Sequence, residues 1–504
     1  MYQVAEARNA ECAREMLQRD DWIVPIYNGK LRTDKPALEY YAMIASYVVG
    51  GVGEGSARFF SAVCGLLLII FTFFFTSSYL GRKVAWWTTL TLLASIHFIV
   101  QFRLATPDPY LILTNTVALY CFLKGWTSKK WKWWGLMYIF LGLAFFAKGP
   151  IGILLPGLIM FLFLIIKRSL NWKTIGALKP WWGILLILLF SAPWYILVHL
   201  RTNGVWTEGF FITHNVDRFS DSMGGHGGPF VLTFIFVFVG MLPFSVFIIQ
   251  AIGHTWKRMR KNDILLLSFL SFACVVGFYC LSRTKLINYT VPAYPFIAIM
   301  LGTYLYHLSK KVIKGKGLAI SYILLIIFTI GLPIAYYFWS QSLVELQDLG
   351  WLTIFFILFP IGGIAAFYYF RKKKFIKSFN FIAGSFILST LIVFAYPYPK
   401  IDAQTTTIKA KPYLYKDRPI AYWKKFNDAF VFYAKHPIPE LEDTSELNSF
   451  LRKHQDALII SISEDQETLQ ERSDLKLIQK RHEIFNSHTS FIYRQISPIK
   501  DKNN

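Results

Sequence analysis

The side chains best suited to chemistry in this sequence are charged groups that interrupt apolar stretches. Lys148 lies in AFFAKGPIG, Asp108 follows Arg103 in RLATPDPYL, and Arg283 and Lys285 precede LINYTVPAYP. Charged groups at membrane depth are costly, so they usually mark a pathway or a site. A fixed cation can hold an anion, and a carboxylate can remove a proton from a reacting group. The pattern predicts an anion-handling site, although Lys148 could instead reach the membrane surface along its own stem and Asp108 could simply cap a helix.

The composition indicates what must position these groups. The chain has 504 residues, of which 54% are apolar and 18% aromatic, while only 16% are charged. Soluble globular chains carry about 25% charged residues, so this balance predicts a membrane protein. The net charge of +23 does not indicate a nucleic-acid partner, because the basic residues alternate with apolar segments instead of gathering on one face. The five cysteines show no spacing typical of a disulfide framework or a zinc site.

Apolar runs predict about twelve membrane-spanning helices, since a span needs about 20 mostly apolar residues. They lie near 58–80, 84–101, 109–123, 133–147, 150–166, 181–200, 229–252, 264–281, 287–307, 317–338, 351–370 and 379–396. Lys and Arg concentrate in one set of alternate loops, which the positive-inside rule assigns to the cytoplasm. Residues 1–56 and 397–504 are therefore expected to face the periplasm or the exterior. An N-terminus on that side needs a membrane helix before it, so we expect one N-terminal span to be missing from this chain.

The polar N-terminal segment supplies further charged groups. VAEARNAECAREML, at 4–17, has the apolar spacing of a short interfacial helix and carries Glu6 and Arg8. DDWIVPIYNGKLRTDKPALEYY, at 20–41, contains an Asn-Gly turn and places Asp34 and Lys35 before Pro36, which can open the next helix.

The order of these motifs resembles that of a known family. VAEARNAECAREML, DWIVPIYNGKLRTDKPALEYY, SARFFSAVCGLL, RLATPDPYLIL, GLAFFAKGPIG and NYTVPAYP follow one another over about 300 residues. Together they resemble the bacterial aminoarabinose transferase and protein O-mannosyltransferase superfamily. The resemblance implies a GT-C glycosyltransferase, family 39-like, with thirteen membrane helices and a polyprenyl-phosphate sugar as donor. It also implies an amphipathic first external loop that holds catalytic groups, and a C-terminal periplasmic domain.

The resemblance carries over residue by residue, with one departure. The first external loop of the family reads Asp-Glu-x-Arg, whereas this chain reads Ala5-Glu6-Ala7-Arg8, so the position of the proposed base is occupied by alanine. The other matches are Asp34 and Lys35 in an acidic-Lys-Pro motif, Asp108 in the second external loop, Lys148 in a Lys-Gly-Pro element, and His214 where a His is common.

Transfer of a sugar from a lipid phosphate requires a carboxylate near the acceptor and cations near the departing phosphate. The candidate catalytic residues are Asp108, Glu6 and Asp34; Asp108 is favoured because Glu6 points about 100° away from the position of Ala5 on a helix. The candidate ligands of the donor phosphate are Lys35, Arg8, Lys148 and Lys285. No nucleotide-binding motif is present. No cofactor is assigned, although a divalent metal could bind near His214 with Asp34, Asp217, Asp221 and His226, and SMGGHGGPF could act as a lid.

We therefore expect an all-α polytopic membrane protein with the GT-C fold. Its expected parts are a first external loop (1–56), a transmembrane domain (57–396) and a small extracytoplasmic α/β domain (397–504), with strands at 419–423, 429–434 and 457–463 and a helix near 445–454. The expected function is transfer of a sugar from a polyprenyl-phosphate donor to an envelope glycolipid, glycan or protein, at the outer face of the inner membrane. The alternative is a polytopic transporter or lipid flippase, although no internal repeat typical of transporters is visible.

Overall fold

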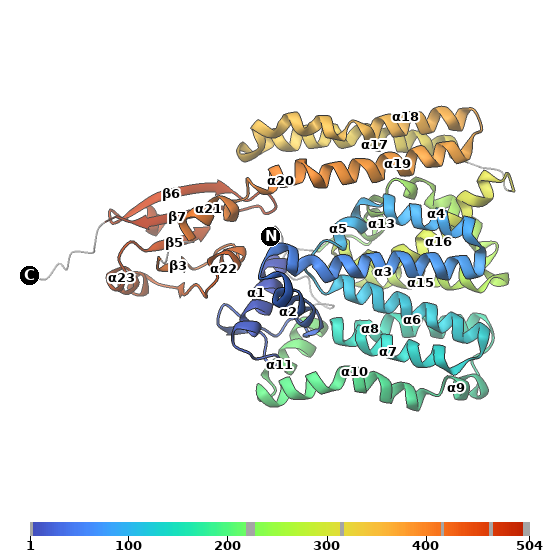
Figure 1. Cartoon of the computed structure of the whole chain (residues 1–504), viewed down its shortest axis with the longest axis horizontal. Coiled ribbons are helices and arrows are strands. Elements are labelled where there is room, and N and C mark those ends of the chain that lie inside the picture. The colour runs from blue at the N-terminus through green and yellow to red at the C-terminus, as the bar shows by residue number, and fades with distance from the viewer. Residues whose placement is uncertain (1–3, 218–226, 313–316, 415–417, 463–466, 497–504) are drawn as a thin grey trace, which may run out of the picture.

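The computed structural model describes residues 4–217, 227–312, 317–414, 418–462 and 467–496. Long helices lie side by side along the long axis of the molecule, and a small sheet domain lies beyond one end of them (Figure 1). The first external segment lies between these two parts. It consists of α1 (Val4–Gln18), a hairpin of β1 (Ile26–Tyr27) and β2 (Lys30–Leu31), and α2 (Leu38–Gly50).

The membrane domain runs from α3 to α19. Its helices are α3 (Glu54–Leu80), α4 (Arg82–Ala94), α5 (Ile96–Gln101), α6 (Asp108–Ser128), α7 (Trp131–Lys148), α8 (Ile151–Ile166), α9 (Trp172–Leu178), α10 (Pro180–Arg201), α11 (Val205–Glu208), η1 (Gly209–Asp217), α13 (Val231–Gly240), η3 (Phe244–Phe247), α14 (Ile248–Trp256), η4 (Met259–Lys261), α15 (Asp263–Leu281), η5 (Ile287–Ala293), α16 (Tyr294–Ser309), α17 (Leu318–Ser342), η6 (Val344–Phe356), α18 (Leu358–Arg371) and α19 (Phe375–Ala395). One continuous apolar core joins most of them, with α6 and α16 buried along almost their whole length.

The expected number of about twelve spans is not confirmed. Within the described ranges, six helices are long and apolar enough to cross a membrane, and a seventh is counted if the bent pair Val231–Gly240 and Phe244–Trp256 forms one span. Several predicted spans are shorter, more polar or interrupted. The run 84–101 breaks at Ser95, whose side chain caps α5, and the run 229–252 bends by 118° near Pro243. Both breaks depend on polar or proline residues that a hydropathy pattern averages away.

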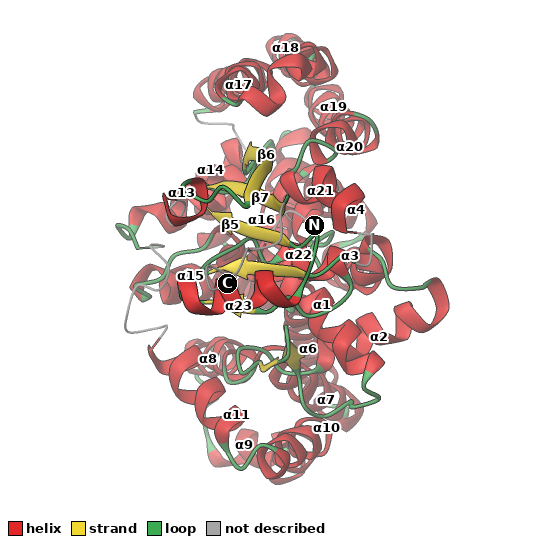
Figure 2. Ribbon diagram, turned by 90° about the vertical axis from the view of Figure 1, so that its left-hand side faces the viewer, coloured by secondary structure: helices red, strands yellow, loops and turns green. Residues whose placement is uncertain are grey.

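The C-terminal domain is a mixed five-stranded sheet with helices on both faces (Figure 2). The connecting helices are α20 (Pro397–Asp402) and α21 (Thr406–Leu414). The domain then contains β3 (Ile420–Trp423), α22 (Ala429–Ala434), β4 (Glu440–Leu441), α23 (Thr444–Lys453), β5 (Leu458–Ile462), α24 (Glu467–Gln470), β6 (Leu475–His482) and β7 (Thr489–Gln495). The strand order is β4-β3-β5-β7-β6, so β6 is an edge strand. The pairs β3–β4 and β3–β5 are parallel, and β5–β7 and β6–β7 are antiparallel.

Alternation along the strands divides the core of this domain into two layers. Tyr422 and Ile460 pack with α22 and with the first external segment, whereas Trp423 and Ile459 pack with α23 and α24 on the other face. The prediction of a strand at 429–434 was wrong, because these residues form α22. All six side chains of α22 are buried, and Asn427 caps the turn before it by accepting from the backbone N–H of Ala429 at 3.0 Å.

Candidate active site

The central feature of the site is the carboxylate of Asp108, at the first residue of α6. One carboxylate oxygen accepts a hydrogen bond from Lys148 Nζ, and the other accepts from Asn288 Nδ2 at 2.5 Å. These partners come from the last residue of α7 and from η5, so three separate elements meet at one carboxylate. Lys148 Nζ also lies 5.4 Å from the centre of the Tyr289 ring. The structure thus brings together two groups that lie 40 residues apart, at the positions where the sequence interrupts its apolar runs.

Local sequence explains why Lys148 ends its helix at this point. Gly149 caps α7 with a φ of +75°, a conformation that residues with a Cβ rarely adopt. A Cβ on Gly149 would also lie 2.6 Å from the ring of Phe210, so the turn is closed against η1. An ammonium group in the last turn of a helix is stabilised by the negative end of the helix dipole. The Lys-Gly-Pro element therefore places a cation beside Asp108 and ties that turn to the segment that carries His214.

Asp34 lies in the external segment and is held by Arg32. Its two carboxylate oxygens accept from Arg32 Nε at 2.5 Å and from Arg32 Nη2 at 3.1 Å. Burial opposes ionisation of Asp34, but the charges of Arg32 and Lys35 outweigh burial and lower its pKa well below the ordinary range. Lys35 lies within electrostatic reach of both Asp34 and Asp108, and His214 is near Asp34. Asp34, Lys35, Asp108, Lys148 and His214 therefore belong to one region.

Glu6 is fully buried and has strong partners. Its oxygens accept from Arg58 Nε at 2.6 Å and Arg58 Nη2 at 2.8 Å, and Oε1 also accepts from the backbone N–H of Ala105 at 3.1 Å. Ala5, in contrast, is exposed on α1. Glu6 thus joins α1 to α3 and to the turn before Asp108, and its carboxylate does not occupy the position of the residue before it.

Arg8 and Lys285 have hydrogen-bond partners outside the Asp108 cluster. The Arg8 guanidinium contacts Asp428 of the C-terminal domain at 2.9 and 3.0 Å, and the same carboxylate accepts from Tyr27 Oη at 2.9 Å. Lys285 Nζ donates to the backbone carbonyls of Cys280 and Ser282 at 3.2 and 2.6 Å, at the C-terminal end of α15. The contacts of Arg8 join the external segment to the C-terminal domain, and those of Lys285 satisfy a helix end.

Several residues of the site were missed in the sequence analysis. Arg32 is buried and reaches Asn9 Oδ1 at 2.7 Å as well as Asp34. Asn288 completes the partners of Asp108, and burial raises the pKa of Glu39 well above its ordinary value despite the nearby charges of Arg32 and Lys35. Arg32 lies two residues before Asp34, and Asn288 lies in the quoted motif NYTVPAYP. Their proximity to the motif acids was the only available signal.

The donor set near His214 does not fit a bound metal in the part of the chain that the structure describes. No three His, Cys, Asp or Glu side chains there could hold one ion together, and both oxygens of Asp34 accept from Arg32. Asp221 and His226, and most of the SMGGHGGPF segment, lie outside the described residues. We therefore assign no step of the chemistry to a metal.

Comparisons with known proteins show what the fold and sequence are similar to. Residues 34–197 match the family model described as dolichyl-phosphate-mannose-protein mannosyltransferase. An uncharacterized protein of Aquifex aeolicus is 30% identical over 64% of this chain and 71% of its own length. The undecaprenyl phosphate-alpha-4-amino-4-deoxy-L-arabinose arabinosyl transferase of Shewanella sediminis is 27% identical over 62% of this chain, and the match spans 57% of that relative. The crystal structure of ArnT from Cupriavidus metallidurans bound to undecaprenyl phosphate has a TM-score of 0.80 and 20% identity, covering 98% of this chain and 94% of the other.

The fold, with external helices and carboxylates at the ends of the membrane helices, is that of a GT-C membrane glycosyltransferase. The chain belongs to the superfamily of bacterial aminoarabinose transferases and protein mannosyltransferases.

Proposed function

We propose that this membrane glycosyltransferase transfers a sugar from a polyprenyl-phosphate donor to an envelope glycolipid, glycan or protein. The observation that carries the proposal is the contact of Asp108 with Lys148 and Asn288, beside Lys35. A buried carboxylate paired with an ammonium group, at the end of a membrane helix, offers both a proton acceptor and a phosphate ligand. The relatives described as undecaprenyl phosphate-alpha-4-amino-4-deoxy-L-arabinose arabinosyl transferases have a polyprenyl phosphate in their name, which supports this class of donor.

The proposed reaction uses an exchange of partners at Lys148. The acceptor oxygen attacks the anomeric carbon, the bond from that carbon to the phosphate oxygen breaks, and the electron pair leaves with the polyprenyl phosphate. Lys148 and Lys35 stabilise the negative charge on the departing phosphate. When Lys148 turns toward the phosphate, Asp108 loses its ammonium partner and accepts the proton of an acceptor hydroxyl more readily. Asn288 holds the second oxygen of Asp108 in place throughout.

The remaining candidate residues have supporting roles in this proposal. Asp34 remains ionised and keeps Arg32 and Lys35 in place, whereas Glu6 and Arg58 position the turn that leads to Asp108. Arg8 acts through Asp428, and Lys285 acts through the end of α15. No residue in this set has to act through a metal.

The proposal includes the arrangement in the membrane. Helices such as α6, α7, α8 and α16 add to the six long apolar helices to give about twelve spans, with domain limits at 1–56, 57–396 and 397–504. Lys and Arg are concentrated in the loops at the opposite end of the helices from Asp108, which supports an active site and C-terminal domain that face the periplasm.

The proposal is tested by mass spectrometry of lipid-linked sugars and envelope molecules from cells with and without the gene. We expect one glycosylated envelope product to disappear and one polyprenyl-phosphate sugar to accumulate when the gene is absent. Complementation should restore both signals, and the Asp263→Asn variant, altered at an Asp–Lys pair at the other end of the membrane domain, should complement equally well. Lipid-linked sugars that change leaflet with no missing product would instead indicate a flippase.

A further inference from the structure

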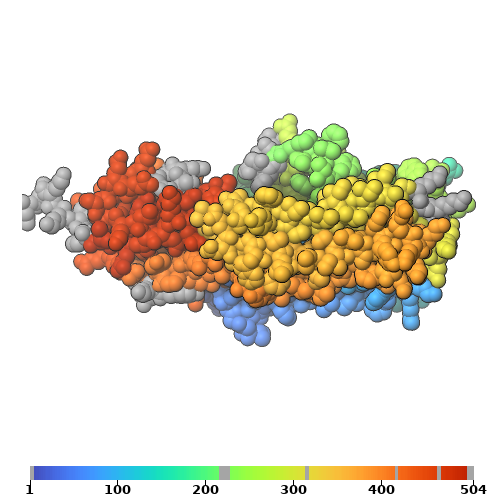
Figure 3. Space-filling model, turned by 90° about the horizontal axis from the view of Figure 1, so that it is seen from above, coloured from blue at the N-terminus to red at the C-terminus, as the bar shows by residue number. Residues whose placement is uncertain are grey.

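A second charged hollow lies at the junction between the membrane helices and the C-terminal domain. Leu343, Val344 and Glu345, which follow α17, line one side, and Lys480, Arg481 and His482 of the edge strand β6 line the other. These six residues define what we call the outer groove. Its volume is about 800 Å³, including its open mouth. Figure 3 shows the junction, where the red residues of the C-terminal domain meet the yellow residues of the helices that precede it.

The charged groups of the outer groove favour an anion. Arg481 donates from Nη2 to the backbone carbonyl of Gln404 at 3.2 Å, while its Nε is buried and has no hydrogen-bond partner among the described residues. Lys480, the preceding residue of β6, also lines the groove and is exposed, with its Nζ 5.6 Å from the centre of the Phe491 ring. Among the residues of the outer groove, Glu345 is the acidic one. Its carboxylate accepts a hydrogen bond from the backbone N–H of His482 at 2.7 Å, so it faces the edge strand of the sheet. A guanidinium with an unpaired Nε, on the same edge strand as an exposed ammonium group, is suited to a phosphate oxygen.

The position of the outer groove relative to the membrane favours a lipid. It lies at the end of α17 opposite the lysine-rich loop that contains Lys310 and Lys311. Val344 on its rim is 80% exposed, as expected for a side chain that contacts acyl chains. At the same end, Lys400 Nζ lies 4.9 Å from the ring of Tyr396 and 5.7 Å from that of Trp351. Aromatic rings with a nearby Lys are typical of the level of the lipid headgroups.

We propose that the outer groove binds the headgroup phosphate of an anionic glycerophospholipid, so that the C-terminal domain is anchored on the membrane surface through β6. Lys480 and Arg481 contact the phosphate, and Val344 contacts the upper part of an acyl chain. The site is separate from the Asp108 cluster and does not depend on the proposed transfer reaction. Its occupant is a bulk lipid of the outer leaflet and not a substrate.

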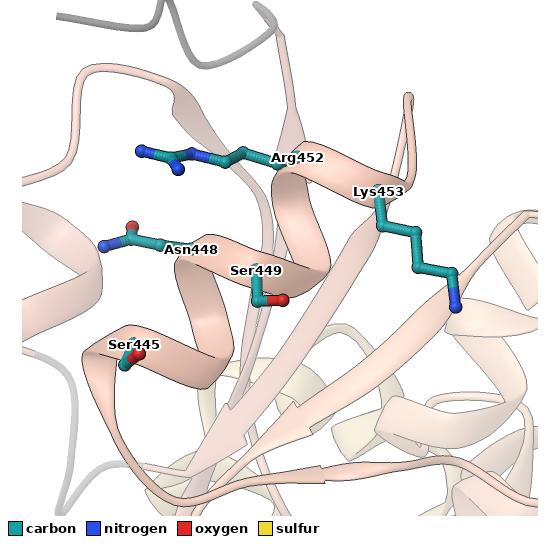
Figure 4. A pocket seen from close by; sticks show the side chains of 5 residues that line it. All are labelled: Ser445, Asn448, Ser449, Arg452 and Lys453. Carbon is teal, nitrogen blue, oxygen red and sulfur yellow. The ribbon is translucent and has the colours of Figure 1, made fainter.

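The chain offers a matched control for the loss of two positive charges. Arg452 and Lys453 line another hollow, on the outer face of α23, together with Ser445, Asn448 and Ser449 (Figure 4). That hollow is also polar and cationic, but α23, which carries it, lies at the end of the C-terminal domain away from the membrane helices (Figure 1). Removal of these two charges changes the net charge of the protein equally and leaves the outer groove intact.

The test is native mass spectrometry of the full chain in detergent, titrated with dioctanoyl phosphatidylglycerol. We expect one saturable lipid adduct whose affinity falls roughly 30-fold in the Lys480→Gln/Arg481→Gln variant, since each cation near an anionic lipid headgroup contributes about a fivefold effect. The Arg452→Gln/Lys453→Gln variant and a Lys148→Met variant should bind as the unaltered protein does. If the double variant does not fold, Lys480→Gln alone, at an exposed position, should weaken binding about fivefold.

Three outcomes would overturn the proposal. If the outer-groove variant bound the lipid as tightly as the α23 variant, the outer groove would not be the binding site. Equal binding of dioctanoylglycerol, which has no phosphate, or of phosphatidylcholine would show that the anionic headgroup is not recognised. Displacement of the lipid by inorganic phosphate at a similar concentration would assign the groove to a free anion instead of a membrane lipid.

Discussion

The Asp108→Asn substitution separates the charge of the proposed base from its size. The amide oxygen of Asn can still accept from Lys148 Nζ, but its NH₂ group then faces Asn288 Nδ2, where two donors meet. Asn288 can turn its own amide so that its carbonyl oxygen faces the new NH₂ group. The substitution therefore weakens one charge-assisted hydrogen bond, which costs about 1.5–3 kcal/mol of folding free energy, and leaves the three elements together.

The expected effect on the reaction is much larger than the effect on folding. Loss of a general base reduces turnover by about 10²- to 10⁴-fold. Lys148 and Lys35 remain to bind the donor phosphate, so the KM for the polyprenyl-phosphate sugar should change little while kcat falls. The assay is steady-state transfer by the purified protein in detergent, with the donor and acceptor identified from the gene-deletion experiment.

A structurally matched variant controls for the loss of an ion pair. Asp263 is the first residue of α15 and pairs with Lys167 at the other end of the membrane domain, with side-chain exposures of 26% and 23%. Asp263→Asn should change thermal stability by an amount similar to Asp108→Asn and leave kcat unchanged. A kcat within threefold of the unaltered enzyme in Asp108→Asn would refute Asp108 as the base.

Three further predictions follow from the contacts of the site, and two of them have a control variant. Lys148→Met should raise the KM for the donor and lower kcat. An unchanged affinity for the donor would show that Lys148 does not bind its phosphate and only stabilises the structure. Asp34→Asn should destabilise the protein by about 3 kcal/mol in thermal unfolding, because it leaves the buried charge of Arg32 without its carboxylate partner. Since the pKa of Asp34 is lowered in the folded protein, this stabilisation is present above about pH 4 and is lost below it. Glu39→Gln is the control and should be nearly neutral, because burial already favours the uncharged form of Glu39. Asp428→Asn should make proteolysis between the membrane and C-terminal domains roughly fivefold faster through loss of about 1 kcal/mol, while Lys30→Gln, at an exposed pair with Glu440, should have no effect.

The sequence predicted the membrane class and the small C-terminal domain because apolar runs and strand alternation are local properties. It did not predict the breaks in the runs, since a hydropathy pattern averages away the polar or proline residue at each break and contains no information on its distant contacts. Ser95 caps α5, and its hydroxyl also donates to the backbone carbonyl of Gly240 at 2.6 Å. The contact joins residues far apart in the chain, and no local pattern encodes it. Similarly, the apolar run AFVFYA fits a buried strand as well as a buried helix, and only the packing around α22 decides between them.

The candidate site was predictable to the extent that its residues interrupt apolar segments. Asp108 and Lys148 stand out for that reason, and the structure brings them into contact. The contact of Arg8 was not predictable in this way. Its motif implies a phosphate ligand, which stays a prediction, and the structure adds a contact with Asp428, 420 residues further along the chain. A pattern can identify a charged side chain, whereas its partner is decided by the tertiary fold.

The alanine at Ala5 and the contacts of Glu6 restrict how the acceptor can be activated. Glu6 accepts from Arg58 and from the backbone of Ala105, so proton removal by Glu6 would break contacts that hold the turn before Asp108. In the proposed mechanism a hydroxyl acceptor therefore uses Asp108 as its base. A phosphate acceptor requires none, because a phosphate oxygen is already ionised at neutral pH. The size of the Asp108→Asn effect consequently reports on the acceptor: a fall in kcat of at least 100-fold indicates a hydroxyl, and a small effect combined with a strong effect of Lys148→Met indicates a phosphate.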